Sequence, residues 1–339
     1  MGGPMGSEKA ERGETLNRGV TQERADDRQF APLPSDEAMR REAARCTGCG
    51  TPLCHGDACV LGNLIPEFLE SVSRGRWEEA SRTLHSTNNF PELTGRLCRS
   101  PCQSVCVQGR QGKPVPIRQL ECHVAERAFA EGWIRPLPPA RRTGRKVAVV
   151  GSAPAGLTIA QQLARAGHEV ALFEKDDRAG ELLRRGVGGC QLDPYLIERR
   201  LRQLAAEGVK FLLGVVVGLH IRGPYLRRGC DAICLTMGTQ GSPDATLAST
   251  SDGSPRLLDR HFAGDLDLIA QLGLQFDDRG NLSVRDCLTS QNNVFAVDEV
   301  ASDLSLAALA IRNGRNAAAA IDRSLQDGDR TREPSRSSA

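Results

Sequence analysis

The pattern of apolar and polar positions divides the chain into two parts. In the second part, short apolar runs rich in β-branched residues alternate with helical patterns, and a glycine-rich turn separates the first run from the first helix. This order is typical of βαβ units with parallel strands, so residues 146–325 are predicted to form a shortened, doubly wound Rossmann-type α/β domain. The expected elements are strands at 146–150, 169–174, 210–213, 232–236 and 294–297, helices at 157–166 and 305–325, and an irregular loop at 242–255.

Residues 36–135 have a different pattern, in which cysteine-bearing loops alternate with short helical segments, expected at 71–85 and 119–129. This pattern predicts a helical domain ahead of the Rossmann-type one, giving an α plus α/β fold class. The flanking segments lack apolar periodicity or are rich in proline. They are a polar extension at 1–35, a Pro-rich linker at 136–145 and a polar tail at 326–339.

Seven cysteines of the helical part fall into two closely spaced blocks. The blocks are Cys46-x2-Cys49-x4-Cys54-x4-Cys59 and Cys98-x3-Cys102-x3-Cys106. Each four-iron cluster needs four ligands, and two-cluster proteins often share cysteines of one block between both clusters. The spacing therefore favours two iron–sulfur clusters, with Cys122 available as a further thiol. Structural zinc is the alternative, because it also binds Cys-x2-Cys pairs.

Composition narrows the classes of function. The 339 residues include 44 Lys or Arg and 42 Asp or Glu, a net charge of +2, which gives no electrostatic case for binding nucleic acid or a membrane surface. No segment is apolar enough to span a membrane, and the opening residues lack the apolar run of a signal peptide. We therefore expect a cytoplasmic protein whose cysteines are ligands or buried thiols. The chain has no nucleophile–base constellation, so no catalytic residue is predicted.

The turn after the first strand of the Rossmann-type part has the pattern of a dinucleotide-binding site. Gly151-Ser-Ala153-Pro-Ala-Gly156 joins that strand to a helix, whose N-terminus suits a pyrophosphate. Glu174 ends the next strand about 20 residues on, where a carboxylate can accept a hydrogen bond from a ribose hydroxyl. These residues predict a bound dinucleotide.

Several motifs resemble the small (β) subunit of NADPH-dependent glutamate synthase and related iron–sulfur flavoproteins, such as dihydropyrimidine dehydrogenase. They lie at 45–55 (RCTGCGTPLCH), 61–66 (LGNLIP), 75–80 (GRWEEA), 87–91 (TNNFP) and 95–98 (GRLC). The resemblance implies two [4Fe–4S] clusters, each held by its own set of four ligands. The first set is Cys46, Cys49, Cys54 and Cys106; the second is Cys59, Cys98, Cys102 and Glu121. Cys122 is the alternative fourth ligand of the second cluster.

The resemblance also implies FAD at the dinucleotide turn, with three departures that weaken this expectation. Ala153 replaces the glycine that lets the backbone approach the pyrophosphate. The family's Gly-Gly after the second strand is Gly180-Glu181 here, and its Gly-Asp near the end is Asp298-Glu299. Gly151, Ala153, Gly156, Glu174, Gly180 and Glu299 are the expected FAD-binding residues. The three departures predict weak FAD binding, an altered pose of the flavin, or a scaffold without the cofactor.

The family's inserted NADPH-binding domain has no counterpart between residues 156 and 293, so no NADPH binding is expected. The sequence therefore predicts an electron-transfer subunit that relays electrons through its clusters to a larger oxidoreductase subunit or another redox protein. A structural or assembly subunit with a degenerate flavin domain is the alternative. A complete NADPH-dependent glutamate synthase small subunit is the third interpretation.

Overall fold

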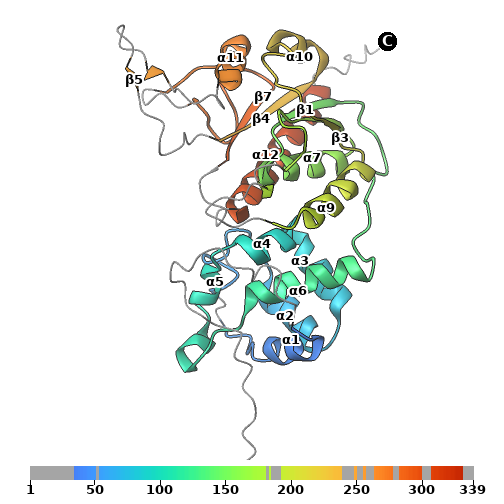
Figure 1. Cartoon of the computed structure of the whole chain (residues 1–339), viewed down its shortest axis with the longest axis vertical. Helices are drawn as coiled ribbons and strands as arrows, with labels where there is room; N and C mark the ends of the chain where they lie inside the picture. The colour runs from blue at the N-terminus through green and yellow to red at the C-terminus, as the bar shows by residue number, and fades with distance from the viewer. Residues whose placement is uncertain are drawn as a thin grey trace, which may run out of the picture.

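The computed structural model describes residues 34–50, 53–180, 183–184, 192–238, 248–249, 255–256, 263–277, 282–299 and 307–330. In these residues, a group of helices at the lower end of Figure 1 is followed by a sheet with helices on both faces at the upper end. The helical group is built from the first part of the chain, and the sheet from the second, as the sequence predicts.

The helical part is packed around one apolar core. Its largest fully buried side chains include Met39, Phe68, Leu84 and Leu120, which come from four different helices. Each such side chain contributes about 1.5–3 kcal/mol through its burial. The helices are α1 (Asp36–Ala43), α2 (Ile65–Ser73), α3 (Trp77–Thr87), α4 (Pro91–Leu97), α5 (Pro101–Ser104), the 3-10 helix η2 (Val107–Gln111) and α6 (Ile117–Ala130).

The prediction of one helix over 71–85 is wrong, because Gly75 divides this segment between α2 and α3. Gly75 has φ +73°, in the left-handed region that glycine adopts without strain, and it follows the last residues of α2. The helix expected at 119–129 is confirmed and lies within α6.

The second part contains a five-stranded sheet in which all strands are parallel, in the order β3-β2-β1-β4-β7. All five expected strands are confirmed, with bounds that agree within two residues. The segment expected to be an irregular loop contains β5 (Ala248–Ser249), which pairs with β6 (Pro255–Arg256); its other residues lie outside the described ones. The strands of the sheet are β1 (Lys146–Val150), β2 (Glu169–Phe173), β3 (Lys210–Leu212), β4 (Ala232–Gly238) and β7 (Val294–Glu299).

Alternate residues of each strand enter two different cores, one on each face of the sheet. In β4, Cys234 packs into the core under α7, α9 and α12, whereas Ile233 and Leu235 pack into the core under α10 and α11. Two buried faces covered by helices define the doubly wound fold that the sequence predicts. The helices are α7 (Pro154–Arg165), α9 (Pro194–Ala206), α10 (Gly223–Gly229), α11 (Ala263–Leu272) and α12 (Ala307–Arg330).

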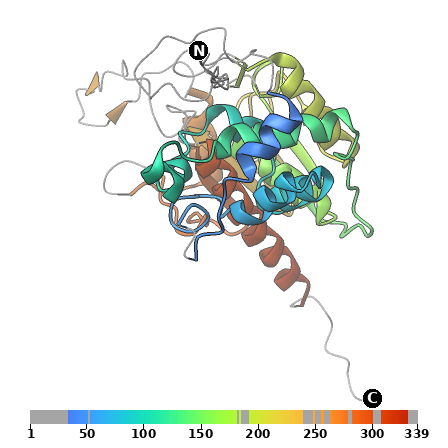
Figure 2. The same cartoon turned by 90° about the horizontal axis from the view of Figure 1, so that it is seen from below.

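Helix α12 is longer than predicted. It continues to Arg330, so the first residues of the expected polar tail are helical, and Figure 2 shows this end of the helix projecting from the body of the molecule. Gln326 donates hydrogen bonds of 2.9 Å to both carboxylate oxygens of Asp322, one helical turn earlier. Such i, i+4 pairs support a helix at polar positions that apolar periodicity does not reveal.

The helical part and the sheet part share a core and a buried polar interface. Phe90 of the loop before α4, together with Leu93 and Leu97, packs into the core under α7, α9 and α12. Beside them, the buried Glu92 carboxylate accepts hydrogen bonds of 2.7 and 2.6 Å from the Arg200 guanidinium of α9. The helical part and the sheet part are therefore joined by side-chain packing as well as by the connecting chain. The domain boundaries expected at residues 135 and 146 stay a prediction.

Gly95 permits the close approach of α4 and α6. A Cβ atom at this position would lie 2.8 Å from both the backbone nitrogen and Cβ of Cys122. Gly95→Ala is expected to lower the free energy of unfolding by about 1–3 kcal/mol, because the two helices must separate to admit the methyl group. Urea unfolding followed by circular dichroism measures this loss. Gly109→Ala is the control, since its nearest neighbour would lie at an ordinary 3.7 Å; equal losses in both variants would contradict the packing argument.

Candidate metal centres and nucleotide-binding turn

The first cysteine pocket lies between the end of α1, the loop before α2 and the segment that joins α5 to η2. Its wall contains the four cysteines of the first expected ligand set, Cys46, Cys49, Cys54 and Cys106. Cys46 is fixed by a 3.0 Å hydrogen bond from its amide to the Ala43 carbonyl at the end of α1, and Cys106 by a 3.2 Å bond to the Gln103 carbonyl. The ends of α1 and α5 therefore orient Cys46 and Cys106, the first and last cysteines of this set.

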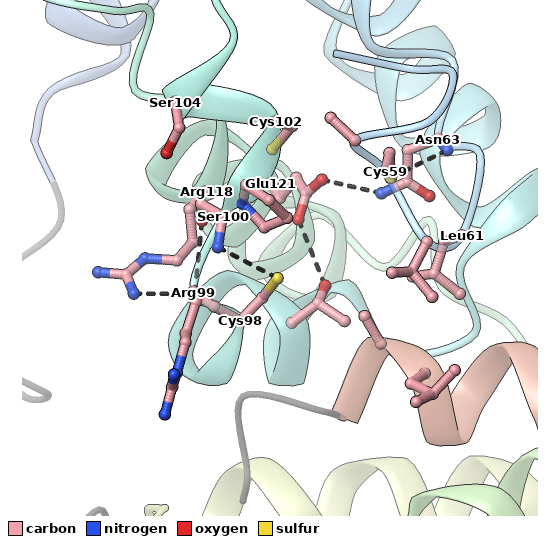
Figure 3. A pocket seen from close by; sticks show the side chains of 16 residues that line it. Cys59, Leu61, Asn63, Cys98, Arg99, Ser100, Cys102, Ser104, Arg118 and Glu121 are labelled. Carbon is pink, nitrogen blue, oxygen red and sulfur yellow. Dashed lines mark hydrogen bonds between the residues drawn. The ribbon is translucent and has the colours of Figure 1, made fainter. Parts of the chain in front are cut away.

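The second pocket, with a volume of about 430 Å³, is lined by the second expected set. Cys98 directly follows α4, Cys102 lies in α5, and Cys59 comes from the loop before α2, while Glu121 projects from α6 between them (Figure 3). The residues of the two expected ligand sets therefore line two different pockets, and their binding of clusters stays a prediction. Within the described residues, no three Cys, His, Asp or Glu side chains are close enough to hold a single metal ion.

Glu121 is buried and bonded through both carboxylate oxygens. Asn63 donates a 2.8 Å hydrogen bond to Oε1 (Figure 3). Thr94 donates a 3.3 Å bond to Oε2, and the Asn63 side chain itself accepts a 2.8 Å bond from Thr87. Burial raises the pKa of Glu121 to about 7, although both hydrogen bonds act to lower it. Asn63 and Thr94 therefore orient a carboxylate that lies beside three thiols.

Backbone amides donate to two sulfur atoms of the second pocket. The Asn63 amide lies 3.4 Å from the Cys59 sulfur, and the Ser100 amide lies 3.3 Å from the Cys98 sulfur. Ser100 adopts φ +55°, a left-handed conformation uncommon for a non-glycine residue, just before Pro101 begins α5. Amide donors to ligand sulfurs stabilise the thiolate and tune the reduction potential of a cluster.

Burial also raises the pKa of one or more thiols in each pocket, which favours their protonated form in the absence of a cation. It raises the pKa of the Cys54 thiol to about 11 and that of the Cys102 thiol further still. Metal binding therefore releases protons, as expected of thiolate ligands that form only with their metal. The donor set of each pocket, three or four thiols with at most one carboxylate, suits iron–sulfur clusters, which bind through thiolates.

Cys122 lies outside both pockets, although it follows Glu121 directly. It is buried against Gly95 of α4, with Arg96 and Glu126 among the charged groups nearest to it. Among the cysteines of the sheet part, Cys234 is buried as predicted, whereas Cys230 and Cys287 are only half-buried, and Cys190 lies outside the described residues. All described cysteines are free thiols.

The turn between β1 and α7 has the geometry of a dinucleotide site. A Cβ atom on Gly156 would lie 2.1 Å from the Gly151 carbonyl oxygen, and one on Gly151, which has φ +104°, would lie 2.4 Å from Thr236 Oγ1. Both positions therefore require glycine. Ala153 caps α7 with an extended backbone that any residue adopts, so its methyl group brings no backbone strain.

Glu174 lies next to this turn but is already bonded within the chain. Its Oε2 accepts hydrogen bonds from the Ser152 amide at 3.1 Å and from the Ser152 hydroxyl, and its Oε1 accepts one from the Asp176 amide. The Ser152 hydroxyl oxygen in turn accepts a 2.8 Å bond from the Gly180 amide. A carboxylate has lone pairs for further donors, so a ribose hydroxyl can still be accommodated. Glu299 ends β7, but its side chain and Glu181 lie outside the described residues.

The fold and these sites define an iron–sulfur protein with a Rossmann-like nucleotide domain. Residues 24–133 match the family described as dihydropyrimidine dehydrogenase domain II, 4Fe-4S cluster, and residues 149–193 match the NAD(P)-binding Rossmann-like domain. The predicted fold class and the [4Fe–4S] assignment of the helical part are therefore confirmed. None of the helices in the described part of the chain is long and apolar enough to cross a membrane.

The resemblance to the glutamate synthase small subunit is also confirmed. Over 203 residues the chain is 50% identical to the "Glutamate synthase [NADPH] small chain" of Mycobacterium tuberculosis, covering 60% of this chain and 41% of that one. Over 255 residues it is 40% identical to the protein of that name from Bacillus subtilis, covering 73% and 52%. It also matches 10% of the "Glutamate synthase [NADH]" of Schizosaccharomyces pombe, at 42% identity over 60% of this chain. The chain thus spans about half, or less, of these relatives.

Proposed function

We propose that the chain is an electron-transfer subunit that holds two [4Fe–4S] clusters. Cys46, Cys49, Cys54 and Cys106 hold one cluster; Cys59, Cys98, Cys102 and Glu121 hold the other. The division of these eight side chains between two separate pockets is the observation that carries the proposal. A bound cluster supplies one-electron carriage, while the chain's residues hold it, exclude water and stabilise its charge.

Helix α12 supports a relay between the second pocket and the nucleotide turn. Its first residues, Ala308 and Leu309, line the second pocket. One turn further, a Cβ atom on Gly314 would lie 2.8 Å from the Ala155 carbonyl at the start of α7, which follows the nucleotide turn. One rigid helix thus contacts both sites, and Figure 1 shows it packed beside α7. We infer that a dinucleotide, FAD by resemblance, binds weakly at Gly151, Ala153, Gly156, Glu174 and Gly180.

The partner in this proposal is a larger oxidoreductase subunit. The relatives named as glutamate synthase small chains support this assignment, because a small chain by that name belongs with a larger one. The free cysteines fit a reducing compartment, for which we propose the cytoplasm.

A complete NADPH-dependent glutamate synthase small subunit is the second candidate. The 50% identity to the Mycobacterium tuberculosis protein of that name favours it. The two candidates differ in their electron source, since only the second oxidises NADPH. Anaerobic mixing of the cluster-loaded chain with NADPH distinguishes them: loss of NADPH absorbance supports the second, and unchanged NADPH supports the relay.

The proposal is tested by counting iron, acid-labile sulfide and releasable flavin per chain under anaerobic conditions. Two four-iron clusters require about eight irons and eight sulfides. Electron paramagnetic resonance of the reduced protein then distinguishes cubane clusters from other iron. Zinc in place of iron, or about four irons or fewer per chain, would overturn the proposal of two clusters.

Ala153→Gly is expected to raise the flavin content of the purified chain. The methyl group of Ala153 occupies the position where a glycine lets the backbone approach a pyrophosphate, and removing it strains nothing because the residue is extended. We expect flavin affinity to rise by about tenfold, measured by fluorescence titration with FAD. Ala155→Gly in the first turn of the same helix is the control, and an equal gain there would show that helix flexibility is responsible.

A further inference from the structure

Exposed apolar side chains of the helical part are concentrated over the two cysteine pockets. In the described part of residues 34–135, three large apolar side chains are exposed: Leu53 at 50%, Val105 at 38% and Val60 at 36%. Leu53 and Val105 line the first pocket, and Val60 lines the second. The apolar surface of this part therefore coincides with the candidate redox centres.

Basic side chains surround these apolar residues. Residues 93–120, which carry Cys98, Cys102 and Cys106, contain five Lys or Arg and no Asp or Glu. Arg99 and Arg118 line the second pocket and Arg110 lines the first, all three exposed, and the exposed Lys113 lies nearby in sequence. A chain with 44 basic and 42 acidic residues has no overall excess that would produce such a segment.

Acidic residues also lie close to this surface, among them Glu42, which pairs with Arg45, and one of the basic residues has a structural role. Asp57 is exposed on the loop between Cys54 and Cys59, and Glu67 is exposed at the start of α2. Arg118 donates a 3.0 Å hydrogen bond to the Cys98 carbonyl, so it also fixes a cysteine loop. The side chains of Arg110 and Lys113 are exposed, so a partner can reach them.

We propose that this surface docks a small acidic electron-carrier protein of the ferredoxin class. The cluster face consists of Leu53, Val60 and Val105 with Arg99, Arg110, Lys113 and Arg118. Lys113 belongs to it because its carbonyl accepts a hydrogen bond from Arg45, which directly precedes Cys46. The inference rests on the proposed function, because it names the partner of the same centres. Transient electron-transfer complexes have small interfaces, and a small apolar centre within a charged rim fits such a complex. Complementary charge on the two proteins raises the rate of their association. One electron passes from the reduced carrier to the chain; no bond forms or breaks, and no proton is transferred.

Arg110→Glu combined with Lys113→Glu tests the inference in the cluster-loaded chain. The probe is an acidic plant-type [2Fe–2S] ferredoxin at about 0.01 M ionic strength, where the screening length is about 30 Å. Surface plasmon resonance with the oxidised ferredoxin measures binding, and stopped-flow absorbance with the reduced ferredoxin measures the rate. We expect affinity and rate each to fall about tenfold, and the wild-type rate to fall steeply with added salt.

Arg82→Glu combined with Arg228→Glu is the matched control, because both side chains are exposed elsewhere and the charge change is identical. Wild-type values in the control support a local docking surface. Equal losses in both double variants, or a salt-independent rate, overturn it. Reduction by a photogenerated deazaflavin radical, a small neutral reductant, separates this inference from the proposed function. If the radical reduces the wild type but the ferredoxin neither binds nor reduces it, the docking inference fails alone; if neither reduces it, the proposed function fails.

Discussion

Replacing Glu92 with Gln is expected to lower the free energy of unfolding by about 3–5 kcal/mol, the cost of leaving a buried charge without its partner. Glu92 is fully buried, and Arg200 is almost so, with a further 2.6 Å hydrogen bond from Arg200 to Gln203. Burial acts to raise the pKa of Glu92, but attraction to Arg200 outweighs it and holds this pKa below its usual range. The pair is therefore ionised at neutral pH, and glutamine leaves the guanidinium unneutralised.

The matched control is Glu70→Gln, since Glu70 also pairs with an arginine, Arg74, but both side chains are exposed. Its loss is expected to stay below about 1 kcal/mol. Because the folded pKa of Glu92 is lowered, its stabilisation is complete above the unfolded value of 4.5 and declines as the pH falls below it. Urea unfolding at pH 7 and pH 4 measures both effects. Similar losses in both variants at pH 7 would contradict the buried interface.

The strands of the fold could be predicted because each carries its own signal. Alternate residues of β4 and β7 enter opposite cores, and the apolar, β-branched run that results is visible in the sequence alone. Helices α9, α10 and α11 were not predicted, since their apolar positions are interrupted by charged residues such as Arg200. Arg200 lies in the interface that joins the two parts, where its partner Glu92 is 108 residues away. Local patterns contain no information about such a pairing.

The candidate site was predictable in its residue types but not in its supporting contacts. Spacing and resemblance identified the cysteines and left Glu121 and Cys122 as alternatives. The structure separates the two because neighbouring residues of a helix point about 100° apart. Glu121 therefore lines the second pocket while Cys122 packs against Gly95. Asn63 and Thr94, which hold the Glu121 carboxylate, were missed. Asn63 lies within the family motif at 61–66, and Thr94 directly precedes the motif at 95–98. These positions were the only signal in the sequence that could have pointed to the two residues.

Cys98→Ala is expected to remove one cluster and leave the other, so that iron per chain falls from about eight to about four. The thiol lines the second pocket and accepts the Ser100 amide bond, whereas the four cysteines of the first pocket are untouched by the change. Alanine is used because a serine oxygen could replace the sulfur as a ligand. Iron and sulfide analysis measures the loss, and paramagnetic resonance of the reduced protein identifies the cluster that remains.

Cys122→Ala provides the control that separates ligation from packing. Both cysteines border the contact between α4 and α6, but Cys122 faces Gly95 and lies outside both pockets. It is expected to keep about eight irons, with only the modest loss of stability that follows removal of a buried sulfur. If Cys122→Ala loses about four irons while Cys98→Ala keeps them, the second ligand set is wrong. If both lose all iron, assembly of the two clusters is coupled through the helical core, and the two pockets cannot be loaded independently.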